Sequence, residues 1–255
     1  MGSSPAAAAR ARPVPLLAAA LLAVVPGRTS AAEVQISWDR DLAFEWDRAN
    51  YEKTLREMVR ASEAEVSSWL GWSRGRALEV RVITRERYEA QFGSAAAWNS
   101  GARYARGAIH VNGGARLGGW FAGILTHEMT HAFLDDRGTA WRLPTWLNEG
   151  LAERLGYRTR GLNDLTTTQV QQLEVALQQR QLVPLPAGGG MTPFRYLQAF
   201  AAVLFLEKKL GKETLLAVVR RAMKEGTFEQ ALDAEVRWTT RNVEEGFSYW
   251  VDHLQ

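Results

Sequence analysis

The residues whose types and spacing most clearly indicate chemistry are His127, Glu128 and His131, which form the sequence H-E-x-x-H. Histidines four positions apart project from the same side of a helix, where they can share one metal ion. The glutamate beside them can reach a water on that metal without occupying a ligand position. Apolar residues typical of a buried helix flank the motif: Ile124, Leu125, Met129 and Phe133. We therefore predict a metal site, the alternative being two buried histidines that bond only to the backbone.

A second motif follows in the stretch Leu143-Pro-Thr-Trp-Leu-Asn-Glu149-Gly-Leu-Ala-Glu153. A catalytic zinc ion needs a third protein ligand and one open position for water. Between His131 and Glu149, Gly138 and Pro144 are typical of a helix end and a helix start. The chain can therefore double back and turn Glu149 toward the two histidines. This makes Glu149 the predicted third ligand.

H-E-x-x-H followed by W-L-N-E-G-x-A resembles the gluzincin zinc peptidases, specifically the small peptidase MA-like proteins. The resemblance extends from about Leu78 to the C-terminus. It includes Tyr196-Leu-Gln-Ala199, where the family has a Tyr-x-Gln segment that opens the helix on the far wall of the cleft. The resemblance implies a two-lobed, thermolysin-like fold with one Zn²⁺ per chain. His127, His131 and Glu149 would bind this ion, and Glu128 would be the general base.

Three further residues are assigned supporting roles. By resemblance, Tyr196 is the donor that stabilises the oxyanion of the tetrahedral intermediate; alternatively its ring packs in the core. Glu153 lies one helical turn after Glu149, and Asp135 lies one turn after His131. Each could accept a proton from the free nitrogen of a ligand histidine, or could be an ordinary solvated helix residue. We expect Glu153 and Asp135 to form a second shell around the metal.

Apolar periodicity predicts an α+β fold, because strands come first and helices follow. Alternating patterns indicate strands at 34–38, 78–84 and 108–111. Helical patterns cover about 51–70, 117–136, 145–156, 167–180 and 193–210, and two more helices are expected to close the chain. We expect a single peptidase MA-like domain over residues 33–255. A lobe with the small sheet and the active-site helix would span about 33–158, and a helical lobe about 159–255.

The first 32 residues are typical of an export signal. Arg10 and Arg12 precede an apolar run from Val14 to Val25, and Ser30-Ala-Ala32 offers a cleavage site. An uncleaved membrane anchor or an Ala-rich tail is the alternative interpretation. We therefore expect an exported protein, periplasmic or extracellular, without stable membrane insertion once the signal is removed.

Composition excludes several function classes. The chain has no cysteine, which rules out disulfides, thiolate metal ligands and Cys nucleophiles. It has 31 basic and 28 acidic residues, and the predicted signal holds Arg10, Arg12 and Arg28 but no acid. The expected mature chain is therefore neutral, and its charge gives no reason to expect a nucleic-acid partner. The expected partner is a peptide or protein substrate.

The stretch before the H-E-x-x-H motif bears on the choice of substrate. Gluzincin aminopeptidases bind the substrate amine with an acidic G-x-M-E-N stretch, but here no Asp or Glu occurs between Glu89 and Glu128. We therefore expect an endopeptidase. If Ala105–Val111 is the strand along the cleft, Arg103, Arg106 and Arg116 would surround the groove and favour acidic substrates. Alternatively, these arginines pair with distant acids or point into solvent.

Taken together, the motifs predict an exported zinc endopeptidase acting on a protein or peptide. Two alternatives remain open. One is a zinc-bearing peptide-binding or envelope scaffold protein with weak catalysis. The other is an amide hydrolase that acts on cell-wall peptide.

Overall fold

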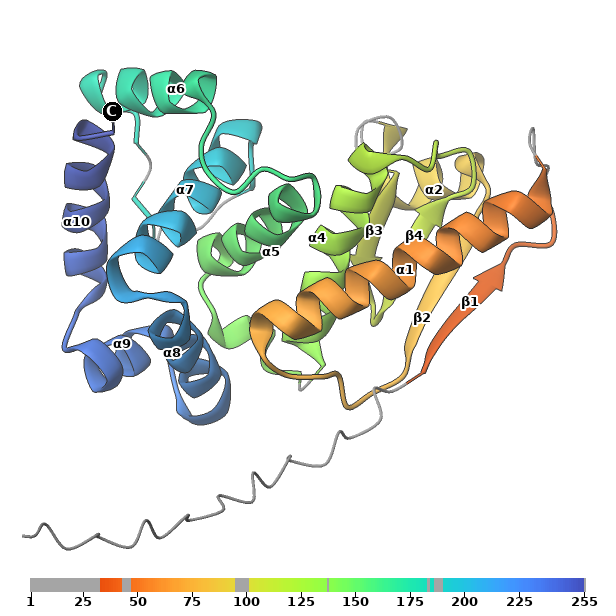
Figure 1. Cartoon of the computed structure of the whole chain (residues 1–255), viewed down its shortest axis with the longest axis horizontal. Coiled ribbons are helices and arrows are strands. Elements are labelled where there is room, and N and C mark those ends of the chain that lie inside the picture. Colours follow the sequence, from red (N-terminus) through yellow and green to blue (C-terminus); the bar gives the residue numbers. More distant parts are fainter. Residues whose placement is uncertain are drawn as a thin grey trace, which may run out of the picture. The chain divides into compact units, whose positions relative to one another are not determined.

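The structure is a computed structural model, and it describes residues 33–42, 47–94, 101–136, 138–182, 184–185 and 190–254 (Figure 1). The predicted signal segment, residues 1–32, lies outside the described residues. Where the chain is described, no helix is both long enough and apolar enough to cross a membrane.

A mixed four-stranded sheet forms the N-terminal part of the structure. Its strands are β1 (Val34–Trp38), β2 (Leu78–Ile83), β3 (Ala102–Ala105) and β4 (Ala108–Asn112). They lie in the order β1-β2-β4-β3, with β1 and β4 parallel to β2 and β3 antiparallel to β4. The β3–β4 hairpin turns at Arg106 and Gly107, whose φ angles of 52° and 77° are those of a type I′ turn. Because β3 comes last in the strand order, it is an edge of the sheet.

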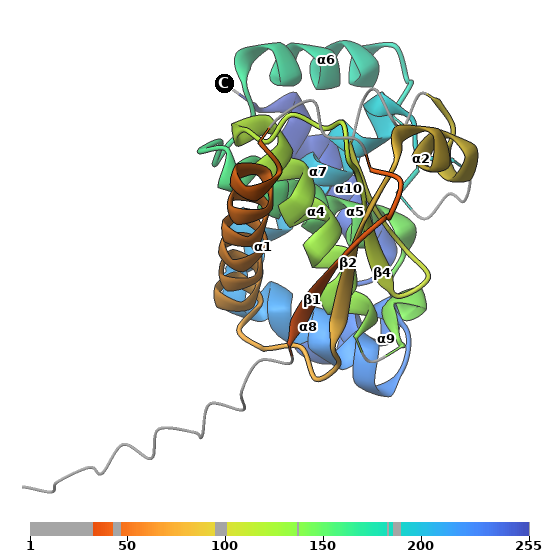
Figure 2. The same ribbon diagram turned by 90° about the vertical axis from the view of Figure 1, so that its right-hand side faces the viewer.

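Helices cover both faces of this sheet (Figures 1 and 2). Helix α1 (Arg48–Leu70) and helix α4 (Gly119–Asp135) lie side by side on one face, and α2 (Arg85–Phe92) lies on the other. Val80 of β2 and Ile109 of β4 are paired and fully buried under α1 and α4. Their neighbours Arg81 and His110 point to the opposite face, because side chains alternate along a strand.

The rest of the chain is helical. It comprises the 3₁₀ turn η1 (Ala140–Arg142), α5 (Thr145–Thr159), α6 (Thr167–Gln178), α7 (Pro193–Leu210), α8 (Lys212–Glu225), α9 (Phe228–Val236) and α10 (Thr240–Asp252). Helix α5 lies between α4 and α7 (Figure 1). Helix α7 begins with the side chain of Thr192 accepting a hydrogen bond from the amide of Arg195, with Pro193 at its first position. Its middle turns are buried all round.

The predicted α+β fold is confirmed, with four corrections. Helix α2 was not predicted, because it is short and buries only Tyr88. Strand β3 was not predicted, because four residues give too little alternation to read. The proposed cleft strand Ala105–Val111 was wrong, since this range crosses the hairpin turn and the edge strand is Ala102–Ala105. Three helices, not two, follow α7, because Gly226 separates α8 from the short α9.

Glycines let α4, α5 and α7 approach each other closely. A Cβ atom on Gly156 of α5 would lie 2.8 Å from the carbonyl oxygen of Gly123 on α4, so the two backbones are in direct contact. Gly150 of α5 meets α7 in the same way, because a Cβ atom there would collide with the carbonyl oxygen of Ala199. These contacts place the helix with the H-E-x-x-H motif against the helix that carries Glu149, and place the latter against α7.

Hydrogen bonds between hydroxyl groups join α4 to α1 and to α5 through the interior. Thr126 of α4 donates a hydrogen bond of 2.9 Å to Ser62 of α1 or to the carbonyl of Ala122, and Thr159 of α5 donates one of 3.1 Å to Thr126. Thr126 directly precedes the first histidine of the motif. These bonds therefore help to fix the rotation of α4 at the histidines.

We predict that Gly156→Ala destabilises the protein, because the added methyl group would force α4 and α5 apart. Overpacking of this kind costs about 1–3 kcal/mol of unfolding free energy. The matched control is Gly119→Ala at the start of α4, where a Cβ atom would meet nothing within 4 Å. Urea denaturation of the two variants measures the difference. Equal unfolding free energies would show that the helices do not depend on this close contact.

Candidate metal centre

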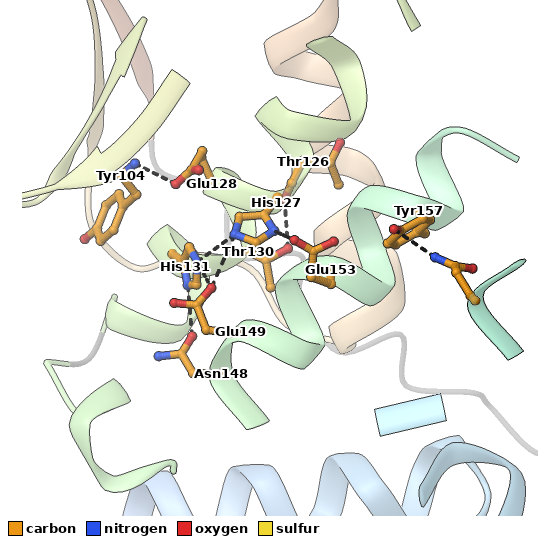
Figure 3. Close-up of polar contacts among 11 residues, drawn as sticks. Tyr104, Thr126, His127, Glu128, Thr130, His131, Asn148, Glu149, Glu153 and Tyr157 are labelled. Carbon is orange, nitrogen blue, oxygen red and sulfur yellow. Dashed lines mark hydrogen bonds and ion pairs between the residues drawn. The ribbon is translucent and has the colours of Figure 1, made fainter. Parts of the chain in front are cut away.

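Helix α4 presents His127 and His131 on the side that faces α5 (Figure 3). Their Nε2 atoms are 3.1 Å apart. The side chains of His127 and His131 are 14% and 15% exposed, respectively. The potential ligand atoms of His127, Glu128 and His131 all lie within 4.8 Å of one another. The predicted cluster is therefore present in the structure, and it has the composition of a site that could hold a metal ion.

The carboxylate of Glu149 on α5 forms a compact group of three atoms with the two Nε2 atoms of the histidines. Its Oε2 atom is 3.5 Å from Nε2 of His127 and 3.4 Å from Nε2 of His131. In a tetrahedral zinc site with bonds of about 2.0–2.1 Å, neighbouring ligand atoms are roughly 3.3–3.4 Å apart. The two nitrogens and this oxygen are thus spaced as three ligands of one ion would be.

The other ring nitrogens of the two histidines have their own partners. Nδ1 of His131 is 2.9 Å from Oδ1 of Asn148, and Nδ1 of His127 is 3.3 Å from Oε1 of Glu153. Both partners are acceptors, so in the neutral imidazoles the proton belongs on Nδ1 and the lone pair on Nε2. Two lone pairs and a carboxylate oxygen then face one another. That buried Oε2 atom of Glu149 accepts no hydrogen bond from any described residue. A cation held between these three atoms would interact favourably with both lone pairs and with the carboxylate.

The pKa values of these groups follow the same electrostatics. Burial lowers the pKa of His127, but Glu149 and Glu153 raise it, and the net value lies well above that of a free histidine. Burial raises the pKa of Glu149, but the two histidines lower it by a larger amount. Its net pKa therefore falls below the usual range of a carboxyl group. The site therefore favours an added positive charge, which a proton or a metal ion can supply.

Glu128 lies on the other side of the histidines from Glu149 (Figure 3), with its potential ligand atom within 4.8 Å of theirs. It is the most buried of the acidic residues here, with an exposed fraction of 8%, and its Oε2 atom accepts a hydrogen bond of 2.7 Å from the backbone amide of Tyr104 on β3. Figure 3 shows Glu128 on the β3 side of α4 and Glu149 on the α5 side. The edge strand thus holds one carboxylate apart from the histidines, while α5 brings another one close to them.

An open cavity of about 380 Å³ borders the cluster, and Tyr196 of α7 lines it. The ring centroid of Tyr196 is 6.3 Å from that of His127. Burial, followed by the negative charges of Glu149, Glu128 and Glu153, raises the pKa of Tyr196 to about 12. Its hydroxyl is therefore protonated at neutral pH and can act as a hydrogen-bond donor toward the cavity.

Glu153 and Asp135, which we predicted to accept hydrogen bonds from the histidines, lie in different environments. The Oε1 atom of Glu153 lies 3.3 Å from Nδ1 of His127. Asp135 was placed wrongly, because its Oδ2 atom accepts a hydrogen bond of 2.8 Å from the hydroxyl of Tyr104 instead of contacting His131. Asn148 takes the position at His131. Its place directly before Glu149, in the first turn of α5, was the signal that could have identified it.

The three arginines expected around the groove are separated in the structure. Arg103 lines the cavity beside the histidines. Arg106 is exposed at the hairpin turn, and Arg116 lines a different cavity together with Asp47 and Tyr51. The expectation that all three surround one groove was wrong, because it placed the turn and both strands on a single extended segment.

No family model matches the chain, and no curated protein matches it. The observations that support a candidate metal centre are those of its geometry. In an α+β protein, a histidine–glutamate–histidine cluster with H-E-x-x-H spacing lies on a buried helix next to an open cavity.

We predict that the purified protein contains about one zinc ion per chain and that His131→Ala loses most of it, because two remaining ligands bind zinc weakly. The matched control is His253→Ala, since His253 is half exposed and stacks on Tyr249 near the C-terminus. Metal analysis by mass spectrometry gives the stoichiometry. Full zinc content after replacement of both His127 and His131 would refute the site.

Proposed function

We propose that the protein is a zinc-dependent metallopeptidase of the gluzincin type. The main support for this proposal is that two carboxylates on either side of the histidines make different contacts. Glu149 is within 3.5 Å of both Nε2 atoms, as a ligand would be, and Glu128 is held apart by the amide of Tyr104. A hydrolytic zinc site needs both, one to bind the ion and the other to move a proton.

The donor set fits zinc better than it fits Mg²⁺ or Ca²⁺. Two imidazole nitrogens and one carboxylate oxygen are the ligands of hydrolytic zinc sites, whereas Mg²⁺ and Ca²⁺ prefer shells made of oxygen alone. The open cavity on one side of the three atoms leaves room for a water and a substrate. His127, His131 and Glu149 would hold one ion per chain.

A zinc ion held by His127, His131 and Glu149 would lower the pKa of a bound water to about 7 and would polarise a substrate carbonyl group. Glu128 accepts a proton from the attacking water and passes it to the nitrogen of the leaving amine. The amide of Tyr104 fixes the carboxylate of Glu128 in position for both transfers. Tyr196 donates a hydrogen bond to the oxygen that becomes negative in the tetrahedral intermediate, because its raised pKa keeps the phenol protonated.

The edge strand supports an extended peptide as the substrate. In an antiparallel pair, alternate residues direct their amide and carbonyl groups away from the partner strand. Tyr104 is such a residue, since its amide bonds to Glu128 and not to β4. Its carbonyl group faces the open edge, where a substrate strand can pair with it. The free edge of β3 therefore offers a peptide a binding mode that ends beside the metal ligands.

The carboxylates of the cavity favour action as an endopeptidase. Three acidic residues line it: Glu128, Asp135 and Glu149. Each is already engaged, with the amide of Tyr104, the hydroxyl of Tyr104 and the two histidines respectively. A free substrate amine would thus find no carboxylate without a partner among the residues that line the cavity. We further propose that the N-terminal 32 residues direct export, so that the peptidase acts in the periplasm or outside the cell.

We predict that Glu128→Gln retains zinc but loses activity on a peptide library by at least ~10²-fold, because an amide cannot accept the proton of water. The matched variant Glu149→Gln is expected to lose zinc, because it replaces a charged ligand with a neutral one. Metal content and turnover are measured on both proteins. Equal zinc loss in the two variants would show that these roles are assigned wrongly.

We also predict that peptides with an acetylated N-terminus are cleaved as fast as the same peptides with a free amine. An endopeptidase makes no use of the substrate amine, so the two rates should agree within about twofold. Mass spectrometry of the products gives rates and cleavage positions. Cleavage that requires the free amine would show an aminopeptidase, and cleavage of cell-wall peptide alone would favour the amide-hydrolase alternative.

A further inference from the structure

Arg103 occupies a distinctive position at the edge of the sheet. It lies on β3, pairs across the ladder with His110, and follows Ala102, whose side chain points into the core. Its own side chain is directed to the face of the sheet that carries α2, where its guanidinium lies 5.7 Å from the ring centroid of Phe92. Arg103 also lines the cavity that contains the two histidines. It is therefore a positive charge at the rim of the candidate metal centre.

This charge has no acidic partner among the described residues. Arg81 shares the same face of the sheet on β2 and forms a 2.6 Å ion pair with Glu79. Arg87 of α2, close in sequence to Phe92, forms one of 2.7 Å with Asp39. Within the described part of the chain, the guanidinium of Arg103 lies over the ring of Phe92 and forms no ion pair. The absence of any Asp or Glu between Glu89 and Glu128 means that its own strand supplies none either.

The guanidinium acts electrostatically across the cavity. Burial and the carboxylates of Glu149, Glu128 and Glu153 raise the pKa of Tyr196, and the positive charge of Arg103 opposes them. Arg103 of β3 and Tyr196 of α7 both line this cavity. A peptide that lies between β3 and Tyr196 would pass next to it.

We propose that Arg103 binds a carboxylate of the substrate next to the cleaved bond, so that the preferred substrates are acidic peptides. The inference rests on the proposed peptidase function. A substrate strand that pairs with β3 places alternate side chains on the two faces of the sheet. Side chains on the α2 face then lie about 5 Å from Arg103 as cross-strand neighbours, within reach of its guanidinium. Arginine suits this role because its planar group binds a carboxylate in bidentate fashion.

The structure separates Arg103 from the other two arginines of the same acid-free segment. Arg106 is at the hairpin turn and does not line the cavity of the metal centre. Arg116 lines the cavity of about 260 Å³ formed with residues of α1. The substrate preference should therefore depend on one residue, and Arg116 provides a control of the same chemical type.

The test uses peptides that differ only in carrying Glu, Gln or Lys at each position beside the cleaved bond. All are capped at both ends, and a second set has a free C-terminal carboxylate. For the wild-type protein we expect kcat/KM to be about tenfold higher with Glu than with Gln at one of these positions, and the ratio to shrink in high salt. Arg103→Gln should reduce the ratio to about one, and Arg103→Glu should favour Lys. Arg116→Gln should behave like the wild type.

The two sources of the carboxylate give different results. A Glu preference in the capped set identifies an acidic side chain, and a preference only for uncapped peptides identifies the C-terminal carboxylate. A wild-type protein that cleaves all peptides alike, or a Glu preference that survives in Arg103→Gln, would overturn the role of Arg103 and leave the peptidase function intact.

A binding measurement keeps the two proposals separate if no peptide is cleaved, a result that would count against the peptidase function. Fluorescence anisotropy of labelled Glu and Gln peptides is then compared between the wild type and Arg103→Gln. About tenfold tighter binding of the Glu peptide by the wild type alone would support a carboxylate site at Arg103. Equal binding of both peptides by both proteins would exclude that site.

Discussion

Helices α4 and α5 touch backbone to backbone at Gly123 and Gly156, and the candidate metal ligands His127, His131 and Glu149 cluster one to two helical turns from this contact. His127 follows Gly123 by one turn, and Glu149 precedes Gly156 by two. Larger side chains at the crossing would widen the gap between the helices and move the carboxylate away from the imidazoles. Ligand atoms spaced at 3.1–3.5 Å leave little room for such a shift. The cluster therefore depends on two residues that carry no functional group.

The electrostatics of the site follow from where this contact puts the acidic residues. Glu149, Glu153 and Glu128 surround His127, and each has a different neighbour: the Nε2 pair, the Nδ1 of His127 and the amide of Tyr104. Gathering three carboxylates around two imidazoles in a partly buried place is unfavourable unless a positive charge compensates, and either a proton or a metal ion can supply it. A divalent ion between the Nε2 atoms and Glu149 would supply that charge and leave Glu128, held by the edge strand, available for proton transfer.

Sequence reasoning predicted the parts of the site that depend on local periodicity. The spacing of His127 and His131 placed both on one face of a helix, and a short connection to the next helix was enough to bring Glu149 to them. The errors arose where a residue from a distant segment decides the contact. Asp135 has the right helical position to support His131, but its carboxylate accepts a hydrogen bond from the hydroxyl of Tyr104 on β3. The side-chain oxygen of Asn148 lies beside Nδ1 of His131 in its place. No spacing rule predicts Tyr104 as a neighbour, because β3 itself is too short to recognise by alternation.

We propose that one zinc ion is bound by His127, His131 and Glu149, with Glu128 outside its coordination shell. Diffraction from crystals of the purified protein, recorded on both sides of the zinc absorption edge, tests this most directly. We expect one anomalous peak per chain, about 2.0–2.2 Å from both Nε2 atoms and a carboxylate oxygen of Glu149. A peak coordinated by Glu128 in place of Glu149, or zinc bound away from the two histidines, would contradict it.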